Sequence, residues 1–225
     1  KALTSRCKDI TTIIQNVNNR KTSAVLGDKE KVLFGKGFIT DILLGKKFKI
    51  SAKSFYQINS SQCAVLYSKA MELANLSKTD ILFDAYCGVG TIGLVASDKV
   101  AKVIGVELVK DAVNDAIYNA KMNNVKNIHF FCDDASNFMK NMAVKKEKVD
   151  VVIMDPPRKG SDAKFLNAVV KLAPKKVIYI SCDPRTQVVD LKHLLDNGYQ
   201  IMAIQPVDMF PFTSHIENIV LLKRG

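Results

Sequence analysis

The chain has 225 residues, five cysteines and a formal net charge of +11, so it can bury a substantial core and attract a polyanion such as a nucleic acid. An odd number of cysteines without a C-x-x-C pair argues against a disulfide framework and a metal site, and free thiols favour the reducing cytoplasm. No apolar run approaches the ~20 residues that span a bilayer and no secretion signal is visible, so a membrane or secreted protein is not expected.

The first part of the chain, residues 1–60, predicts a small β-rich appendage, because short apolar runs alternate with glycine turns. We expect strands within 10–17, 32–34 and 48–50. The chain begins with lysine instead of methionine, and we therefore expect it to be part of a longer protein. After the segment 54–59, a helix is predicted, with one face made of Ala64, Tyr67, Ala70, Met71 and Ala74.

The second part, residues 61–225, predicts an α/β domain with a doubly wound, mostly parallel seven-stranded sheet. Five strands are expected at intervals of about 22 to 27 residues, with helices between them: 81–85, 103–106, 128–132, 151–154 and 177–180. Two further apolar runs, 201–207 and 219–222, have no helix between them and predict an antiparallel hairpin at the end of the sheet. One crossover helix is predicted after Glu107, with Val113, Ala116, Ile117 and Ala120 on its apolar face.

A cysteine lies at the end of the fifth predicted strand. Cys182 is followed by Asp183, a suitable N-cap, and by Pro184 in the first turn of a helix that ends near Gly198. The apolar residues Val188, Leu191 and Leu195 predict the buried face of that helix. A helix N-terminus favours the thiolate, the form of cysteine that attacks electrophiles. The alternative is that Cys182 is a small buried apolar residue.

A glycine-rich loop follows the first strand of the sheet. Asp84 precedes Gly88, Gly90 and Gly93, which formally satisfy G-x-G-x-x-G, and Glu107 lies 19 residues after Gly88. Glu107 can accept both ribose hydroxyls of a nucleoside cofactor, whether S-adenosylmethionine or a nicotinamide dinucleotide. An acid before the loop favours S-adenosylmethionine, which has an ammonium group and no phosphate. A nicotinamide dehydrogenase remains open from this loop alone.

Two more motifs follow strands of the same sheet. Asp155 is held by two prolines at the end of the fourth strand, and Glu217 enters the last strand from an aromatic loop that contains His215. We interpret His215 as structural; Glu217 by itself could be a surface residue. The carboxyl ends of parallel strands meet at one edge, so Asp84, Asp155 and Cys182 are expected to lie together.

These segments together resemble the S-adenosylmethionine-dependent RNA 5-methyluridine methyltransferases over essentially the whole chain. The matching segments are Ser54–Asn59, Asp84–Thr91, Gly105–Glu107, Asp155–Arg158, Ser181–Pro184 and Asp208–Pro211 through His215–Glu217. The resemblance implies a Rossmann-like class I methyltransferase fold with Cys182 as the nucleophile and Glu217 as the base. It also implies a cofactor site that includes Gln57, Tyr86, Glu107, Asp134 and Asp155.

The chemistry explains these residue types. Carbon 5 of uracil is too weak a nucleophile to take a methyl group directly, and a thiolate that adds to carbon 6 supplies the missing electron density. Glu217 would then remove the carbon 5 proton, while Asp155 would orient the uracil. The target base must leave its stack to reach the pocket.

The flanking sequence is more similar to the bacterial 23S ribosomal-RNA branch than to the transfer-RNA branch. Ribosomal-branch members often carry an iron-sulfur cluster, which is expected here only in an N-terminal part outside this sequence, because Cys7 matches no cluster spacing. Family members usually have an N-terminal oligonucleotide-binding barrel as well. The alternatives are a transfer-RNA uracil-C5 enzyme, an RNA cytosine-C5 methyltransferase and an inactive RNA-binding module. No membrane or protein partner is implied.

Overall fold

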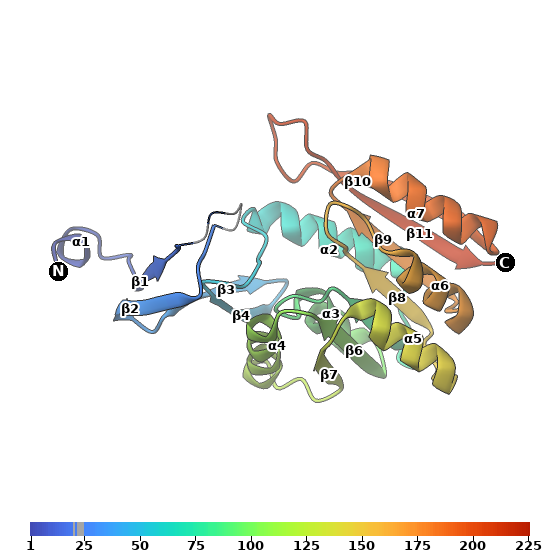
Figure 1. The fold of residues 1–225 in the computed structure, drawn as a ribbon, viewed down its shortest axis with the longest axis horizontal. Helices are drawn as coiled ribbons and strands as arrows, with labels where there is room; N and C mark the ends of the chain where they lie inside the picture. Colours follow the sequence, from blue (N-terminus) through green and yellow to red (C-terminus); the bar gives the residue numbers. More distant parts are fainter. Residues whose placement is uncertain (20, 22–24) are drawn as a thin grey trace.

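The computed structural model describes residues 1–19, 21 and 25–225. The N-terminal part contains the short helix α1 and two antiparallel hairpins, and it extends from one end of the molecule in Figure 1. Strand β1 pairs with β2, and β3 pairs with β4. The bounds are α1 Ala2–Arg6, β1 Thr12–Val17, β2 Lys29–Gly35, β3 Phe38–Leu43 and β4 Lys46–Ser51.

The main body is built on a seven-stranded sheet with the order β10-β11-β9-β8-β5-β6-β7. Strands β5 to β9 run parallel, and β11 runs antiparallel to both of its neighbours, β9 and β10, so that β10 points the same way as β9. Their bounds are β5 Ile81–Ala85, β6 Lys102–Glu107, β7 Ile128–Cys132, β8 Val151–Met154, β9 Lys176–Ser181, β10 Tyr199–Val207 and β11 Glu217–Arg224. The predicted doubly wound, mostly parallel seven-stranded sheet is thus confirmed.

Helices cover both faces of this sheet, because successive strand residues point to opposite sides. One core cluster joins the sheet to α2, α3 and α4, and the other joins it to α5, α6 and α7. The helices are α2 Ser60–Ala74, α3 Thr91–Ala96, α4 Lys110–Met122, α5 Ala135–Lys145, α6 Ala163–Leu172 and α7 Pro184–Asp196, with a 3-10 turn at Ser97–Lys99. Among the described residues, no helix has both the length and the apolar character needed to cross a bilayer.

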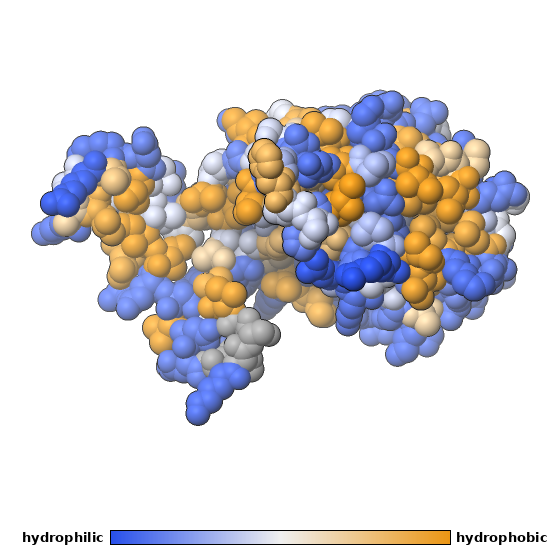
Figure 2. All heavy atoms as spheres, turned by 90° about the horizontal axis from the view of Figure 1, so that it is seen from above, coloured by the Kyte–Doolittle hydropathy of each residue, from blue (hydrophilic) through white to orange (hydrophobic). Residues whose placement is uncertain are grey.

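The surface of the N-terminal part mixes apolar and polar side chains, seen as orange and blue spheres at the left of Figure 2. Every residue of β2 is exposed, including Val32, Leu33 and Phe34. Residues 1–60 contain twelve lysines and arginines against four acidic residues, which gives a formal charge of +8 out of the chain's +11. The positive charge is therefore concentrated in this part of the chain.

Three details of the sequence-based prediction were wrong. Strand β3 was missed; it is paired to β4 through a tight turn in which Leu44 and Gly45 both have positive φ. In α7, Val188 and Leu195 are exposed. Ile117 of α4 is exposed as well, because the side of that helix facing β4 carries polar residues that hydrogen-bond to the strand.

Candidate active site

The predicted site residues gather at the carboxyl edge of the sheet. Asp84 lies in β5 one residue before its end. Strands β6 and β7 follow on one side of β5, and β8 and β9 on the other side, so the order in which strands are added to the sheet reverses at β5. Glu107 ends β6, Asp155 directly follows β8, and Cys182 directly follows β9. Open α/β sheets bind ligands in the crevice at such a reversal point.

The loop after β5 is shaped by its glycines and by Asp84. Gly90 caps α3 with a φ of 82°, and a Cβ there would come within 2.6 Å of the Phe130 ring. The fully buried Asp84 accepts a hydrogen bond from the Gly93 amide through Oδ2 at 2.8 Å. Its Oδ1 is buried without a hydrogen-bond partner in the described part of the chain. Burial raises the pKa of Asp84 to about 7. An unsatisfied carboxylate oxygen beneath the loop fits a site for a ligand with positive charge.

Glu107 connects the glycine loop to the start of α4. Its carboxylate accepts hydrogen bonds from the Gly88 amide at 3.1 Å and from the Val109 amide at 2.8 Å. A Cβ placed on Gly88 would meet no atom within 4 Å, so the space above the loop is open to a ligand. Glu107, which was predicted to bind the ribose of the cofactor, therefore lies directly beside the Gly88 backbone, which would approach the same cofactor.

Cys182 directly follows β9, and Glu217 is the first residue of the neighbouring strand β11. Strand β11 pairs antiparallel with β9, and Asn218 is the partner of Ser181. Cys182 follows Ser181 and Glu217 precedes Asn218, so this pairing brings the two residues close together, and the Glu217 charge acts on the Cys182 thiol. Gln187 of α7 joins these two strands, because its Nε2 donates to the carbonyls of Tyr179 in β9 and Asn218 in β11 at 3.0 and 3.2 Å. The sheet thus brings together two residues that are 35 positions apart in the sequence.

Neighbouring charges control the Cys182 thiol. Burial raises its pKa, the carboxylates of Glu217 and Asp155 raise it further, and the Arg158 guanidinium opposes them. Asp183 does cap α7, by accepting from the Arg185 amide at 3.1 Å. The pKa of Cys182 is nevertheless raised, whereas the helix N-terminus alone would lower it, because burial and the two carboxylates outweigh the effect of the helix.

The two acids beside Cys182 also hold their protons more tightly than usual. Burial, followed by the charges of Glu217 and Asp84, raises the pKa of Asp155 to about 8. Burial likewise raises the pKa of Glu217, whose side chain is 6% exposed. A carboxylate that binds a proton more strongly is a better base once it is ionised.

Gln57 is buried in a segment that is held at both ends. Ser54 donates to Asp115 of α4 at 3.0 Å, and Asn59 donates to the Met209 carbonyl in the loop before β11 at 2.9 Å. Asn59 is also the N-cap of α2. The segment 54–59 therefore bridges the N-terminal part to the loop that carries Glu217 into the sheet.

Tyr86 and Asp134 have structural contacts of their own. Tyr86 adopts a φ of 61°, and its hydroxyl lies 3.2 Å from the Ser161 hydroxyl in the loop after β8. Asp134 caps α5 by accepting from the Asn137 amide at 2.9 Å. Both residues lie at the carboxyl edge of the sheet, Tyr86 just after β5 and Asp134 just after β7.

Sequence reasoning missed two residues that organise this edge. Arg158 lies 3.9 Å from the Asp183 carboxylate and 3.0 Å from Nδ1 of His215, so it links the loop after β8 to the loop before β11. Gln187 gave no signal, because a buried glutamine in an amphipathic helix looks like a surface residue. The position of Arg158 directly after the two prolines was the available hint.

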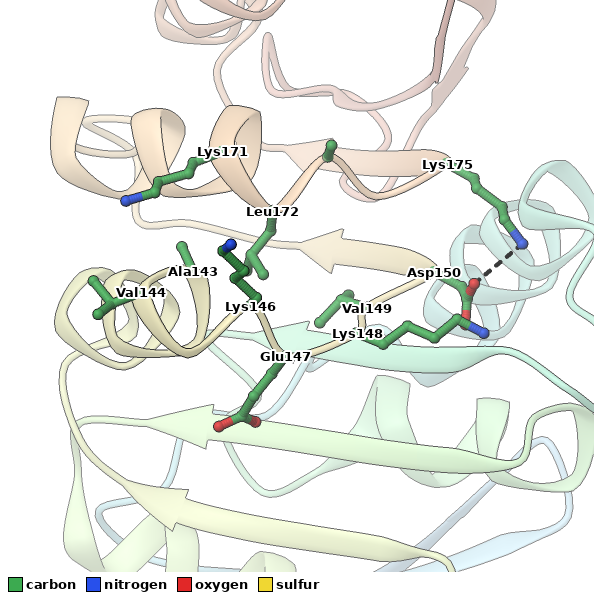
Figure 3. Close-up of a pocket in the computed structure, with 11 residues that line it drawn as sticks. Ala143, Val144, Lys146, Glu147, Lys148, Val149, Asp150, Lys171, Leu172 and Lys175 are labelled. Atoms are coloured by element: carbon green, nitrogen blue, oxygen red, sulfur yellow. Dashed lines mark ion pairs between the residues drawn. The ribbon is translucent and has the colours of Figure 1, made fainter.

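A hollow of about 590 Å³ lies at the opposite, amino-terminal edge of the parallel strands (Figure 3). Asp150, just before β8, pairs there with Lys148 at 3.2 Å and Lys175 at 3.1 Å. Burial opposes ionisation of Asp150, but the Ile81 amide and the two lysines outweigh it and lower its pKa. This arrangement stabilises the fold and lies at the strand ends opposite to Cys182.

Comparison with known proteins gives consistent matches. The sequence model of the family described as tRNA (Uracil-5-)-methyltransferase matches residues 14–225. A relative from Clostridium tetani, described as an uncharacterized RNA methyltransferase, is 46% identical over 220 residues, covering 98% of this chain and 48% of its own. One from Oceanobacillus iheyensis, with the same description, is 44% identical over 222 residues, covering 99% and 48%. The chain spans about half the length of these relatives.

A solved structure is also similar over nearly the whole chain. It is the Pyrococcus abyssi tRNA (uracil-54, C5)-methyltransferase in complex with S-adenosyl-L-homocysteine, with a TM-score of 0.81 and 31% identity. The match covers 97% of this chain and 52% of that one.

Proposed function

The chain belongs to the tRNA (uracil-5-)-methyltransferase family, and on that premise we propose that it transfers a methyl group from S-adenosylmethionine to carbon 5 of a uridine in RNA. The observation that carries this proposal is the pairing of Asn218 with Ser181, because it brings their chain neighbours Glu217 and Cys182 close together. A nucleophile and a base on facing strands can act on neighbouring atoms of one flat ring.

The cofactor is proposed to lie over the glycine loop. Glu107 would accept hydrogen bonds from the ribose hydroxyls, and Gly88 and Gly90 allow the backbone to approach closely. The unpartnered oxygen of Asp84 supports a ligand with a positive charge. Gln57, Tyr86, Asp134 and Asp155 complete the proposed site, and S-adenosylmethionine would supply the methyl group there.

Cys182 and Glu217 would divide the remaining chemistry. The Cys182 thiolate would add to carbon 6, which moves an electron pair to carbon 5; carbon 5 would then bond to the methyl carbon as its bond to the sulfonium sulfur breaks, with S-adenosylhomocysteine as the leaving group. Glu217 takes the carbon 5 proton, the electron pair re-forms the ring double bond, and the sulfur leaves carbon 6. Asp155 would orient the uracil, while Arg158 favours the thiolate that both carboxylates disfavour.

RNA is proposed to contact the N-terminal part together with the catalytic domain. Residues 1–60, which we propose as a unit distinct from the domain 61–225, carry most of the positive charge of the chain. A hollow of about 580 Å³ lies between β1, the β3–β4 hairpin and the segment 52–60, and Gln57 lines it. Phosphate contacts from such a basic region would provide affinity that falls with salt.

For the substrate we propose ribosomal RNA, with transfer RNA as the second candidate because the solved P. abyssi relative is named for it. The two can be separated by mapping 5-methyluridine in ribosomal and transfer RNA from cells that lack the protein. Loss of the modification from ribosomal RNA alone supports the first candidate, and loss from transfer RNA alone supports the second.

The mechanism is tested by trapping the covalent intermediate. Glu217→Gln should still add to the ring and transfer the methyl group, then stall before elimination, so that a denaturation-resistant protein–RNA adduct carrying labelled methyl accumulates. Cys182→Ala should give neither adduct nor methylation while cofactor binding stays nearly unchanged. Wild-type turnover in Glu217→Gln would remove its role as base. An adduct in Cys182→Ala would show that another residue attacks.

A further inference from the structure

Helix α4 binds the edge of strand β4 through a ladder of polar side chains. Asn123 accepts from the Lys47 amide at 2.8 Å and donates to the Lys47 carbonyl at 2.7 Å. Asn119 does the same for Lys49, at 2.7 and 3.3 Å. One turn earlier, Asp115 accepts from the Ser51 amide at 3.0 Å. The side chains of one helix thus take the place of a neighbouring strand.

The two periodicities explain why this ladder fits. Asp115 and Asn119 of α4 and its C-cap Asn123 are spaced by four positions, which advance about 6 Å along a helix. Their partners are spaced by two positions, which advance about 6.6 Å along a strand. The repeats therefore stay in register over two helical turns, and β4 is fixed along its length against α4.

Asn119 has one contact that Asn123 lacks. Its Nδ2 also donates to the carbonyl of Val89 at 3.1 Å, inside the glycine loop between Gly88 and Gly90. Asn119 is 0% exposed, and with these bonds its amide holds the loop and β4 at the same time. Within the residues that the structure describes, Asn123 bonds to Lys47 and to the Asn119 carbonyl, and not to the loop.

The elements joined by Asn119 serve the two proposed ligands. The loop lies beside Glu107, which accepts from the Gly88 amide. Strand β4 belongs to the basic N-terminal part. Lys49 of β4 also forms an ion pair with the buried Asp115 at 2.8 Å, so this strand cannot shift against α4 without breaking buried polar contacts.

We propose that Asn119 is a positioning residue that couples the cofactor loop to the RNA-contacting N-terminal part. Binding of cofactor orders the loop, and through Val89 and Asn119 it holds β4 in the position that receives RNA. By linkage, RNA binding strengthens cofactor binding by the same factor. This inference rests on the proposed function, since it assumes that both ligands bind where that function puts them.

The first test uses S-adenosylhomocysteine and amide hydrogen exchange. In wild-type protein, the ligand should slow exchange at 86–93 and also at 46–51. Asn119→Ala should keep the protection at 86–93 and lose the ligand-dependent change at 46–51. Asn123→Ala is the matched control, because it removes the same pair of bonds to β4 without touching the loop, and it should retain both effects.

The second test measures the affinity for in vitro transcribed ribosomal RNA with and without S-adenosylhomocysteine. The ligand should tighten RNA binding several-fold in the wild type and in Asn123→Ala, and leave it unchanged in Asn119→Ala. If Asn119→Ala does not fold by circular dichroism, Asn119→Ser is measured in its place. Three results would overturn the inference. The ligand still tightens RNA binding in the Asn119 variant, the tightening is lost equally in both variants, or it is absent from the wild type. A wrong proposed function would give a different result from a wrong coupling, because the wild type would then bind no S-adenosylhomocysteine at the loop.

Discussion

Asp84→Asn should make the stability of the protein less dependent on pH. Burial raises the pKa of Asp84 from 3.8 to about 7, so the folded protein binds this proton more tightly than the unfolded chain does. The free energy of unfolding therefore falls as pH rises from about 4 to about 7, because ionisation is easier in the unfolded state. Asparagine keeps an oxygen for the Gly93 amide and cannot ionise.

The magnitude follows from that shift. One pKa unit corresponds to 1.36 kcal/mol, so the full penalty above pH 7 is about 4 kcal/mol, of which about 2.5 kcal/mol develops between pH 5 and pH 8. Urea denaturation at these two pH values should show the wild type losing about 2.5 kcal/mol more than Asp84→Asn. Asp155 contributes a fall of the same sign, and because the Asp84 charge raises its pKa, this fall is smaller in Asp84→Asn and adds to the difference in the same direction.

Asp150→Asn is the matched control. Asp150 is also buried, but its pKa is lower in the folded protein than in the unfolded chain. Its ionised form therefore stabilises the folded protein above the pKa of an unfolded aspartate, and this stability is lost only as the pH falls below that value. This variant should be less stable than the wild type at both pH 5 and pH 8, with the same change between them. If Asp84→Asn loses as much stability between pH 5 and pH 8 as the wild type does, the proposed ionisation of the buried Asp84 is refuted.

Three further changes test the site. Glu107→Ala should weaken S-adenosylmethionine binding at least about 10-fold in calorimetry, because hydrogen bonds to a charged acceptor contribute roughly 1.5–3 kcal/mol each; unchanged affinity would remove Glu107 from the site. Glu217→Gln should speed alkylation of Cys182 by iodoacetamide at pH 8, measured by peptide mass spectrometry, because it removes a charge that raises the thiol pKa; an equal rate would contradict this electrostatic role. Gln187→Leu should lower the free energy of unfolding by about 1–3 kcal/mol and reduce kcat with cofactor affinity unchanged, because the Asn218 side chain loses its buried partner; wild-type kcat would show that Gln187 does not position β11.

The fold could be predicted from the sequence wherever local pattern decides it. Strands β5 to β9 are apolar runs of four to six residues, and each is followed by a helix pattern, so their parallel pairing and common edge follow from topology. Asp84, Asp155 and Cys182 could be assigned to that edge for the same reason. Asp183 and Pro184 also begin α7 where capping rules place them.

Other features depend on contacts that local pattern does not contain. The pairing of Glu217 with Cys182 requires β11 to enter between β9 and β10, and a hairpin at the end of a chain could equally have added its first strand to β9. Three of the four residues predicted for the buried face of α4 are buried, but the burial of Asp115 and Asn119 was not predicted because they are polar. Their burial makes sense only with β4 beside them, and β4 lies more than sixty residues earlier in the chain.

The strand order has a consequence for how the protein is made. Strand β11 is synthesised after both of its neighbours, so the growing chain exposes an unpaired edge of β9 until residues 217–224 emerge. Open strand edges promote association between chains, and this nascent sheet therefore depends on rapid completion or on a chaperone. For the same reason, a nonsense mutation after β10 leaves a gap in the interior of the sheet instead of trimming its border. Such products should be degraded or aggregate even though they retain most of the sequence.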